Sequence, residues 1–415
     1  MKASDLKGKT IGFAASGGLD SCTITHWLSS QGVKVICFTA DLGQPDEDNF
    51  SDIKERMLAS GALDFISIDL KKEIAEIGLE LIQCNARYEF GYWNLTGAAR
   101  QVIVNGIVRN LKPYNLNILS HGATGRGNDQ IRFQIIASML NPNLDFYAAW
   151  RDEEFLKNFK GRKEMIDYCI THKIPIKASS EKPYSTDSNL LGLTHEGGLL
   201  EDLKNSVYEV EPELGFWPKN CPDEALTIKL TFENGIPKKL NNDTVSLIDL
   251  FSKLNHIGGV HGVGIAKNLV ENRIIGVKSR GVYESPAIEI LGNCYQYLLS
   301  IIVDKRTLET YKYMSNELGN RLYEGYWIDL NSTMIKSAIK KITNLVNGEI
   351  TIELYKGKIQ IISVKNVKNS LYTLDGSMEN EGNFDHADSE GLVKILTLSA
   401  RNISNAQQVE ETDND

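Results

Sequence analysis

The chain has 415 residues, which is long enough for two domains. Its apolar share of 42% and charged share of 24% are those of an ordinary globular protein, and no apolar run reaches membrane-spanning length. A net charge of −9, without a block rich in Lys and Arg, argues against a nucleic-acid partner. Because residues 1–5 lack the apolar core of a signal peptide, we expect a cytoplasmic protein with no membrane partner.

The six cysteines form no Cys-x-x-Cys pair, and several of them lie in apolar runs. This placement predicts buried free thiols and argues against a zinc site or a redox pair. His195-Glu196 has no third ligand at a suitable spacing, so we expect no resident metal site.

The first part of the chain alternates β-prone apolar runs with helical patterns. Strands are expected at 10–15, 34–41, 64–69, 118–121 and 145–149, and helices at 22–30, 48–60, 70–84, 98–111, 130–140 and 162–172. Such alternation with short connections predicts an α/β fold with a doubly wound parallel sheet. In these sheets, ligands bind beyond the carboxyl ends of the strands.

The composition changes after residue 172, where we place a domain boundary. Residues 179–198 are polar and without periodicity, which predicts a long functional loop. An α+β domain over 173–401 is expected from strands at 225–233, 273–277 and within 349–364, a turn at 234–237 and a helix at 244–255. The acidic end, 402–415, is expected to be a disordered tail.

The loop Ser16-Gly17-Gly18-Leu19-Asp20-Ser21 joins the first expected strand to the first expected helix. Its glycines let the backbone approach a ligand closely, and the helix N-terminus adds a positive dipole end. Backbone N–H groups and two hydroxyls can then point at one anion. The loop predicts a phosphate site, with a plain strand-to-helix turn as the alternative. A second loop, 122–129, leaves the strand at 118–121 in the same sense, so both loops are expected to face one pocket.

Two common phosphate motifs do not account for the first loop. Gly8-Lys9-Thr10 matches the end of a P-loop, but Ala3 occupies the first glycine position and the match precedes the strand. The dinucleotide pattern G-x-G-x-x-G fails because Gln130 and Lys267 stand at the third glycine. What remains resembles the pyrophosphate loop of enzymes that adenylate a substrate. Lys2 and the unpaired cysteines argue against the glutamine-dependent and thiolating members, which leaves a member that uses a free amine.

Several further segments occur together in one order along the chain. They are Tyr92–Gly97, His121–Phe133, Phe159–Arg162, Tyr184–Leu190, His261–Gly264, Val270–Arg273 and Lys278–Pro286. With the first loop, this set closely resembles the argininosuccinate synthase family, from the first strand into the second domain. Each segment alone is unspecific, but the joint match is specific.

The resemblance implies a fold, a reaction and partners. The fold is an adenine nucleotide α-hydrolase-like ATP-binding domain over 1–172, followed by a catalytic and multimerisation domain over 173–401. The reaction is ATP + citrulline + aspartate → argininosuccinate + AMP + pyrophosphate, by way of citrullyl-AMP, with Mg²⁺ accompanying ATP. The enzyme is a ligase of arginine biosynthesis, and a homotetramer is expected. No covalent protein nucleophile is needed, because catalysis rests on alignment and charge.

The resemblance also implies a set of site residues. ATP is expected to contact Ala14, Ala15, Ser16, Gly17, Gly18, Leu19, Asp20, Ser21, Cys22, Ala40 and Gly122. Aspartate is expected at Thr124, Asn128 and Asp129, and citrulline at Tyr92, Thr96, Asn128, Arg132, Ser185, Thr194, Glu271 and Tyr283.

Three of these residues are implied to be catalytic. Asp20 orients Mg²⁺ or the loop itself. Asp129 pairs with the aspartate ammonium or helps to leave its amine neutral. Arg132 binds the citrulline carboxylate, for which its planar guanidinium is suited, while Glu271 faces the citrulline α-amino group.

The chain departs from the family pattern at a few positions. Ala15 replaces a frequent aromatic residue, Gly97 stands where some members have Ser, and Thr194 keeps the hydroxyl of a Ser. The segment after Ser389 is expected to be shorter and less helical than the family's oligomerisation helix. Two other functions stay open: an adenylating ligase for a different ureido or carbonyl substrate, and a non-catalytic nucleotide-binding regulator.

Overall fold

The structure is a computed structural model that describes residues 1–45, 49–89, 91–176, 183–265, 267–379 and 385–409. The chain forms two compact units, Met1–Asn369 and Ser370–Asp415. Among the described residues, no helix is both long and apolar enough to cross a membrane. Short 3-10 helices occur at Ala3–Leu6, Lys112–Tyr114, Ala149–Arg151, Gly198–Glu201, Val207–Glu209, Pro218–Asn220 and Leu374–Gly376.

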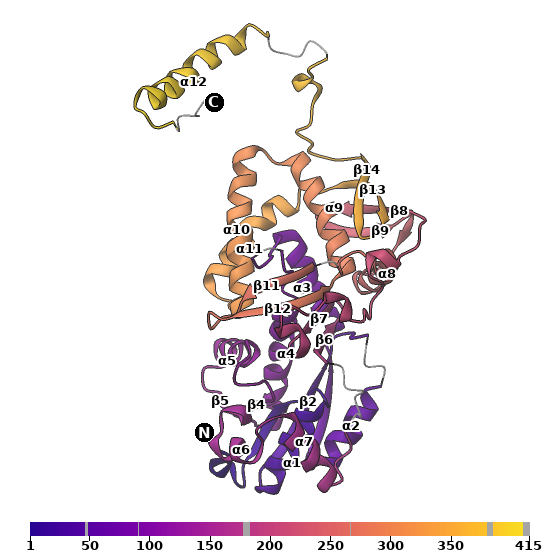
Figure 1. The fold of residues 1–415 in the computed structure, drawn as a ribbon, viewed down its shortest axis with the longest axis vertical. Helices are drawn as coiled ribbons and strands as arrows, with labels where there is room; N and C mark the ends of the chain where they lie inside the picture. Colours follow the sequence, from indigo (N-terminus) through magenta and orange to yellow (C-terminus); the bar gives the residue numbers. More distant parts are fainter. Residues whose placement is uncertain (46–48, 90, 177–182, 266, 380–384, 410–415) are drawn as a thin grey trace. The chain divides into compact units, whose positions relative to one another are not determined.

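A parallel five-stranded sheet forms the N-terminal part of the first unit, as expected (Figure 1). Its strands are β1 (Thr10–Ala14), β2 (Lys34–Asp41), β3 (Asp64–Asp69), β4 (Ile118–His121) and β5 (Asp145–Ala148), in the order β3-β2-β1-β4-β5. β2 pairs with one edge of β1, and β3 pairs with β2. β4 pairs with the other edge of β1. The carboxyl ends of β1 and β4 are therefore neighbours, which brings both small-residue loops to one edge of the sheet.

Helices cover both faces of this sheet. They are α1 (Leu19–Ser30), α2 (Phe50–Ala59), α4 (Leu95–Leu111), α5 (Asp129–Leu140), α6 (Glu153–Asn158) and α7 (Arg162–Thr171). A further helix, α3 (Lys71–Cys84), packs in a separate core. Alternate residues of β2 face opposite cores: Cys37 packs in the core that contains α1 and α7, and Phe38 in the core that contains α4 and α5. This two-sided burial explains the near-continuous apolar run of β2.

A four-stranded antiparallel sheet contradicts the loop expected over 179–198. It consists of β6 (Ser185–Asn189), β7 (Gly192–Glu196), β11 (Lys267–Asn272) and β12 (Lys278–Glu284), in the order β11-β12-β7-β6. β6 and β7 form a hairpin, and 179–182 lie outside the described residues. The pattern concealed this hairpin because β6 is polar on both faces. The strand expected at 273–277 is also wrong, because Gly276, at φ +81°, forms the turn between β11 and β12.

A second antiparallel sheet follows in the order β10-β9-β8-β13-β14. Its strands are β8 (Leu226–Glu233), β9 (Ile236–Leu240), β10 (Asp243–Thr244), β13 (Gly348–Tyr355) and β14 (Lys358–Lys365), which confirms the strands expected over 225–233 and 349–364. The helices are α8 (Leu247–Val260), α9 (Pro286–Ile302), α10 (Lys305–Glu324) and α11 (Leu330–Thr343). The fold is therefore α/β, with a parallel sheet followed by antiparallel sheets. The boundary near residue 172 stays a prediction, since α3 and α4 share one core with α8, α9 and α10.

The second unit contains α12 (Asp388–Asn405), which corrects two expectations about the C-terminus. Asn402–Asn405 are helical and not disordered, and the segment after Ser389 forms most of an 18-residue helix. Its apolar residues recur at helical spacing, and Asp388 and Glu390 lie in the first turn, where they stabilise the helix dipole. Residues 410–415 lie outside the described residues.

Candidate active site

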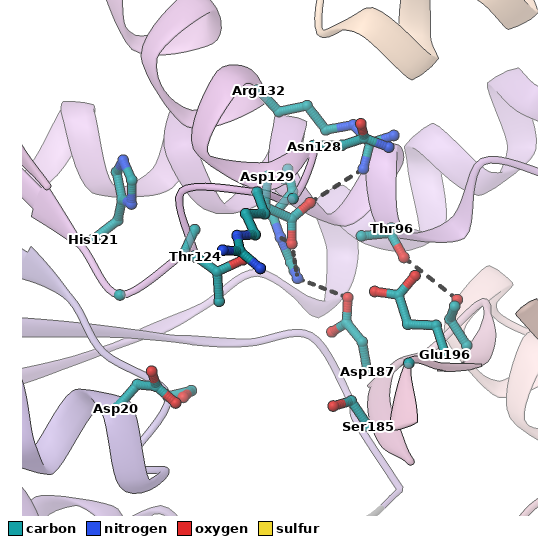
Figure 2. Close-up of a pocket in the computed structure, with 18 of the residues that line it drawn as sticks. Asp20, Thr96, His121, Thr124, Asn128, Asp129, Arg132, Ser185, Asp187 and Glu196 are labelled. Atoms are coloured by element: carbon teal, nitrogen blue, oxygen red, sulfur yellow. Dashed lines mark hydrogen bonds and ion pairs between the residues drawn. The ribbon is translucent and has the colours of Figure 1, made fainter. Parts of the chain in front are cut away.

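A cavity of about 1670 Å³ opens at the carboxyl ends of β1 and β4, between the parallel sheet and the β11-β12-β7-β6 sheet. Most of the residues expected at the site line it: Ala14, Ala15, Ser16, Asp20, Ser21, Ala40, Tyr92, Thr96, Gly122, Thr124, Asn128, Asp129, Arg132, Ser185, Thr194, Glu271 and Tyr283. Gly17, Gly18, Leu19 and Cys22 do not line it. The structure thus brings residues from twelve separate elements and loops to one cavity, several of which are labelled in Figure 2.

The first loop turns sharply between β1 and α1. Gly17 has φ +74°, and a Cβ there would lie 2.7 Å from Ile53 Cγ2, so the turn requires glycine. The Ser21 hydroxyl accepts a hydrogen bond from the Ser16 backbone N–H at 3.0 Å and lies 3.2 Å from Ser16 Oγ. Gly18 is the N-cap of α1 and makes no side-chain cap bond. The first turn of α1 therefore starts beside two hydroxyls, which suits an anion.

Asp20 lies where the two small-residue loops meet. A Cβ at Gly122 would lie 3.7 Å from Asp20 Cβ, so the second loop passes within van der Waals distance of the first. Trp150 donates its indole N–H to Asp20 Oδ1 at 2.9 Å. Burial raises the pKa of Asp20, and the hydrogen bond from Trp150 partly opposes that shift. Asp20 is thus a fixed carboxyl at the end of the parallel sheet that is expected to hold ATP.

Four charged side chains form a network at the start of α5. Arg100, from α4, donates to Asp129 Oδ2 at 2.8 Å and to Asp187 Oδ2, on β6, at 2.7 Å. Arg132 donates to Asp129 Oδ1 at 3.1 Å. Burial alone would raise the pKa of Asp129, but Arg100 and Arg132 outweigh it and lower that pKa. Asp129 is therefore held as a carboxylate between two arginines (Figure 2).

Arg132 is 3% exposed and is fixed from three sides. Besides its bond to Asp129, its Nε donates to the Tyr323 carbonyl oxygen at 2.7 Å, and its guanidinium lies 4.7 Å from the Tyr323 ring centre. The Tyr323 hydroxyl donates to Glu271 Oε1 at 2.9 Å and accepts from the Asn128 amide at 2.8 Å. Tyr323, from α10, thereby links three residues that were expected to contact citrulline.

Glu271 carries a buried oxygen atom, Oε2, that has no hydrogen-bond partner among the described residues. Burial raises the pKa of Glu271, and Tyr323 and Arg132 partly oppose that shift. A buried acceptor of this kind is costly unless a ligand satisfies it. Glu271 is therefore suited to receive a cationic group from a bound molecule.

One face of the β11-β12-β7-β6 sheet supplies the opposite wall of the cavity. Thr194, on β7, lies directly between Asp187 on β6 and Tyr283 on β12. Glu196 follows on the same face of β7, between Ser185 and Gly281. The Thr96 hydroxyl lies 3.3 Å from that of Thr194, and the Tyr92 and Tyr283 rings stack at 4.3 Å. The side chains on one face of the β6–β7 hairpin thus line this wall of the cavity.

The back face of this sheet explains His195. Its Nε2 lies 2.6 Å from Glu284 Oε1 and its Nδ1 lies 3.2 Å from Thr186 Oγ1, so both ring nitrogens have partners inside the protein. Within the described ranges, no group of three His, Cys, Asp or Glu side chains could hold a metal ion. His195 is a structural residue behind the cavity wall.

Gly97 does not contribute a surface to the cavity. A Cβ at this position would lie 3.2 Å from the Leu322 carbonyl oxygen, so glycine permits α4 to pack closely against α10. Its neighbour Thr96 lines the cavity instead. The departure at Gly97 is therefore a matter of helix packing.

Several cavity residues were not predicted as site residues. Arg100, Asp187 and Glu196 line the cavity, and Trp150 and Tyr323 contact predicted residues directly. Asp187 and Glu196 could have been found from the alternation Ser185-x-Asp187 and Thr194-x-Glu196, had the hairpin been recognised. Nothing in the local sequence distinguishes Arg100 or Tyr323 from ordinary helix residues.

Two family models match almost the whole chain. Residues 10–175 match the arginosuccinate synthase N-terminal HUP domain, and residues 184–403 match the arginosuccinate synthase C-terminal domain. Among solved structures, a predicted subunit of a tRNA methyltransferase from Methanocaldococcus jannaschii is similar over 39% of this chain and 74% of that chain, at 17% identity. Its TM-score of 0.27 is too low to support an argument.

Sequence relatives span nearly the full chain. Argininosuccinate synthase of Rhodopirellula baltica is 38% identical over 396 residues, which are 95% of this chain and 97% of the relative. The argininosuccinate synthases of Thermotoga sp. strain RQ2 and Thermotoga maritima are each 37% identical over 403 residues, with the same coverage. With both domains matched and relatives this similar over the full length, the chain belongs to the argininosuccinate synthase family and is an enzyme of the ligase class.

Proposed function

We propose that this enzyme condenses citrulline with aspartate, cleaving ATP to AMP and pyrophosphate by way of citrullyl-AMP. The observation that carries the proposal is that the Ser16–Ser21 loop and a carboxylate–arginine network share one cavity. The loop suits the phosphates of ATP, while the network suits two amino acids. Both charged ends of citrulline then have a matching group, since Arg132 suits a carboxylate and Glu271 Oε2 an ammonium.

In this proposal the residues mainly hold and align the reactants. The ureido oxygen of citrulline attacks the α-phosphate of ATP, and pyrophosphate leaves along the first loop. Asp129, fixed as a carboxylate, pairs with the ammonium of aspartate, with Thr124 and Asn128 beside it. Tyr92, Thr96, Ser185, Thr194 and Tyr283 form the citrulline wall, and Ala40 leaves space for adenine.

We also propose that Mg²⁺ enters with ATP. Asp20 is a carboxylate at the phosphate loop, and the described residues provide no larger acidic cage. This fits a cation held mainly by phosphate oxygens and water, with one or two protein carboxylates. When bound, the cation offsets the negative charge of the phosphates. Asp20 would hold it in place, fixed by the indole of Trp150.

A substrate-omission assay tests the proposed reaction. With ATP, Mg²⁺, citrulline and aspartate all present, we expect argininosuccinate, AMP and pyrophosphate in equal amounts, and no argininosuccinate when any substrate is left out. AMP formation without citrulline would contradict the proposal. A preference for a citrulline analogue one methylene longer or shorter would favour a different ureido substrate, and ATP binding without pyrophosphate release would favour a regulator.

A homotetramer is the assembly we propose. Support comes from α12, on which Leu392, Val393, Ile395, Leu396 and Leu398 are all more than half exposed within the chain. An exposed apolar stripe of this kind is typical of a contact between subunits. We expect a tetramer by sedimentation, and a smaller species for the double variant Leu392→Asp/Leu396→Asp with its secondary structure unchanged. A tetramer that survives this double substitution would exclude α12 as the contact.

A cytoplasmic location also belongs to the proposal. All six cysteines are buried and free, which is typical of a reducing compartment.

A further inference from the structure

Glu196 is a cavity carboxylate for which the described residues provide no side-chain partner. Asp129 and Asp187 share Arg100, and Glu271 accepts from Tyr323. Glu196 lines the same cavity but makes no side-chain hydrogen bond or ion pair within the described part of the chain. Neither the resemblance of the sequence to the family nor the ion network assigns a role to Glu196.

The position of Glu196 is set by the sheet. It lies two residues after Thr194, so both side chains project from the same face of β7 into the cavity. Gly281, directly opposite on β12, has no side chain to cover it. Figure 2 shows Glu196 in the same group of cavity residues as Asp187 and Asp129, whose negative charges act on it. It therefore stands between the wall proposed for citrulline and the residues proposed for aspartate.

The surroundings of Glu196 favour proton uptake. Glu196 is exposed to the solvent of the cavity. Partial desolvation of its carboxyl and the negative charges of Asp129, Asp187 and Glu271 still raise its pKa to about 7, and Arg132 opposes them. Tyr283, on the neighbouring strand, also faces Glu196 and stays neutral because its pKa is raised. A carboxylate with this pKa can accept a proton near neutral pH and release it again, which is the property of an efficient general base.

We propose that Glu196 accepts the proton that the aspartate ammonium must lose before its nitrogen attacks citrullyl-AMP. The inference rests on the proposed function. An N–H bond of the ammonium breaks and an O–H bond forms on Glu196. The freed lone pair forms a bond to the ureido carbon, the C–O bond to AMP breaks with its electrons going to the phosphate oxygen, and the proton later passes from Glu196 to water.

Asp129 is unsuited to this task, although it can bind the same ammonium. The two arginines that lower its pKa make it a good ionic partner and a poor base. Asp187 is occupied by Arg100. The two roles considered for Asp129, pairing with the ammonium and leaving the amine neutral, are thereby divided between Asp129 and Glu196.

The variant Glu196→Gln tests the inference by separating the two half-reactions. Citrulline-dependent exchange of labelled pyrophosphate into ATP reports adenylation, which we expect to stay within about threefold of the wild type because no proton transfer to Glu196 is involved. Argininosuccinate formation should fall by roughly 100-fold or more, the usual contribution of a general base, with most of the loss in kcat. Equal losses in both half-reactions would overturn the inference.

The pH profile provides a second readout. In the wild type, argininosuccinate formation should decline as the pH falls below about 7, because Glu196 then becomes protonated. This acidic limb should disappear in Glu196→Gln, persist in Glu196→Asp, and persist in the control Glu201→Gln, which removes a carboxylate from the rim of the same cavity. An unchanged limb in Glu196→Gln would assign the proton to another group.

Hydroxylamine supplies a third readout, since its nitrogen is mostly neutral at pH 7 and needs no base. Its capture of citrullyl-AMP should proceed at similar rates in the wild type and in Glu196→Gln. A large loss of capture would mean that Glu196 acts before the amine step.

Failure of the proposed function and failure of this inference give different results. If the wild type itself forms no argininosuccinate, the proposed function fails, whereas a wild-type rate in Glu196→Gln overturns only the role of Glu196.

Discussion

Arg100→Met is expected to destabilise the enzyme by about 3 kcal/mol, because Asp129 and Asp187 lose the cation that they share. This value is at the lower end of the usual cost of breaking a buried ion pair, about 3–5 kcal/mol. Asp129 and Asp187 are each less than a third exposed, and Arg100 donates to both. Met occupies a similar volume without the charge. We also expect most of the argininosuccinate activity to be lost, since Asp129 would no longer be fixed from the side of α4.

The comparison variant lies on the same helix. Arg109, near the end of α4, pairs with Glu73 at the surface, with both side chains more than a third exposed. Arg109→Met should cost less than about 1 kcal/mol, as is usual for a surface ion pair. Urea unfolding of both variants under the same conditions measures the difference, and similar costs for the two would contradict the role given to Arg100.

The destabilisation should depend on pH in a defined direction. Burial already raises the pKa of Asp187 in the wild type, and Arg100 opposes that shift. Without Arg100, the pKa of Asp187 rises further above its unfolded value, so the folded variant binds protons more tightly than the unfolded chain. The deficit relative to the wild type should therefore shrink as the pH falls and grow as the pH rises through the raised pKa. The double variant Arg100→Met/Asp187→Asn should recover part of the loss at neutral pH.

Patterns of neighbouring residues were sufficient to predict the parallel sheet and its two loops. Each of its strands is a short apolar run, each helix follows within a few residues, and the Ser16–Ser21 loop is contiguous in the sequence. The rule that strand ends meet at one edge then placed Asp20 beside Gly122 without any further information. This part of the fold is specified by residues that are neighbours along the chain.

The opposite wall could not be predicted in the same way. Every residue of β6 is polar, so its sequence lacks the alternation of apolar and polar residues that identifies a half-buried strand. Arg100 acts through Asp187, 87 positions further on, and Asn128 bonds to Tyr323, 195 positions further on. These pairings depend on sheet register and helix packing, which tertiary contacts determine.

Arg132→Ala is expected to weaken citrulline binding by roughly ten- to a hundredfold, since a hydrogen bond to a charged group contributes roughly 1.5–3 kcal/mol. ATP binding should change little, because Arg132 lies on α5, across the cavity from the Ser16–Ser21 loop. Asp129 keeps Arg100 as its partner in this variant, so the effect on the ion network is smaller than that of losing Arg100. Calorimetric titration of citrulline and of ATP measures both affinities.

Two matched substitutions separate charge from geometry at this position. Arg132→Lys keeps the positive charge but loses the fixed guanidinium plane and its Nε bond to the Tyr323 carbonyl, so we expect it to recover only part of the affinity for citrulline. Arg321→Ala removes an arginine of α10 that pairs with Glu317 outside the cavity, and citrulline should bind it as it binds the wild type. If Arg132→Ala weakened ATP and citrulline equally, Arg132 would be supporting the cavity as a whole. A loss confined to citrulline, with partial recovery in the lysine variant, requires that the guanidinium itself receives the carboxylate.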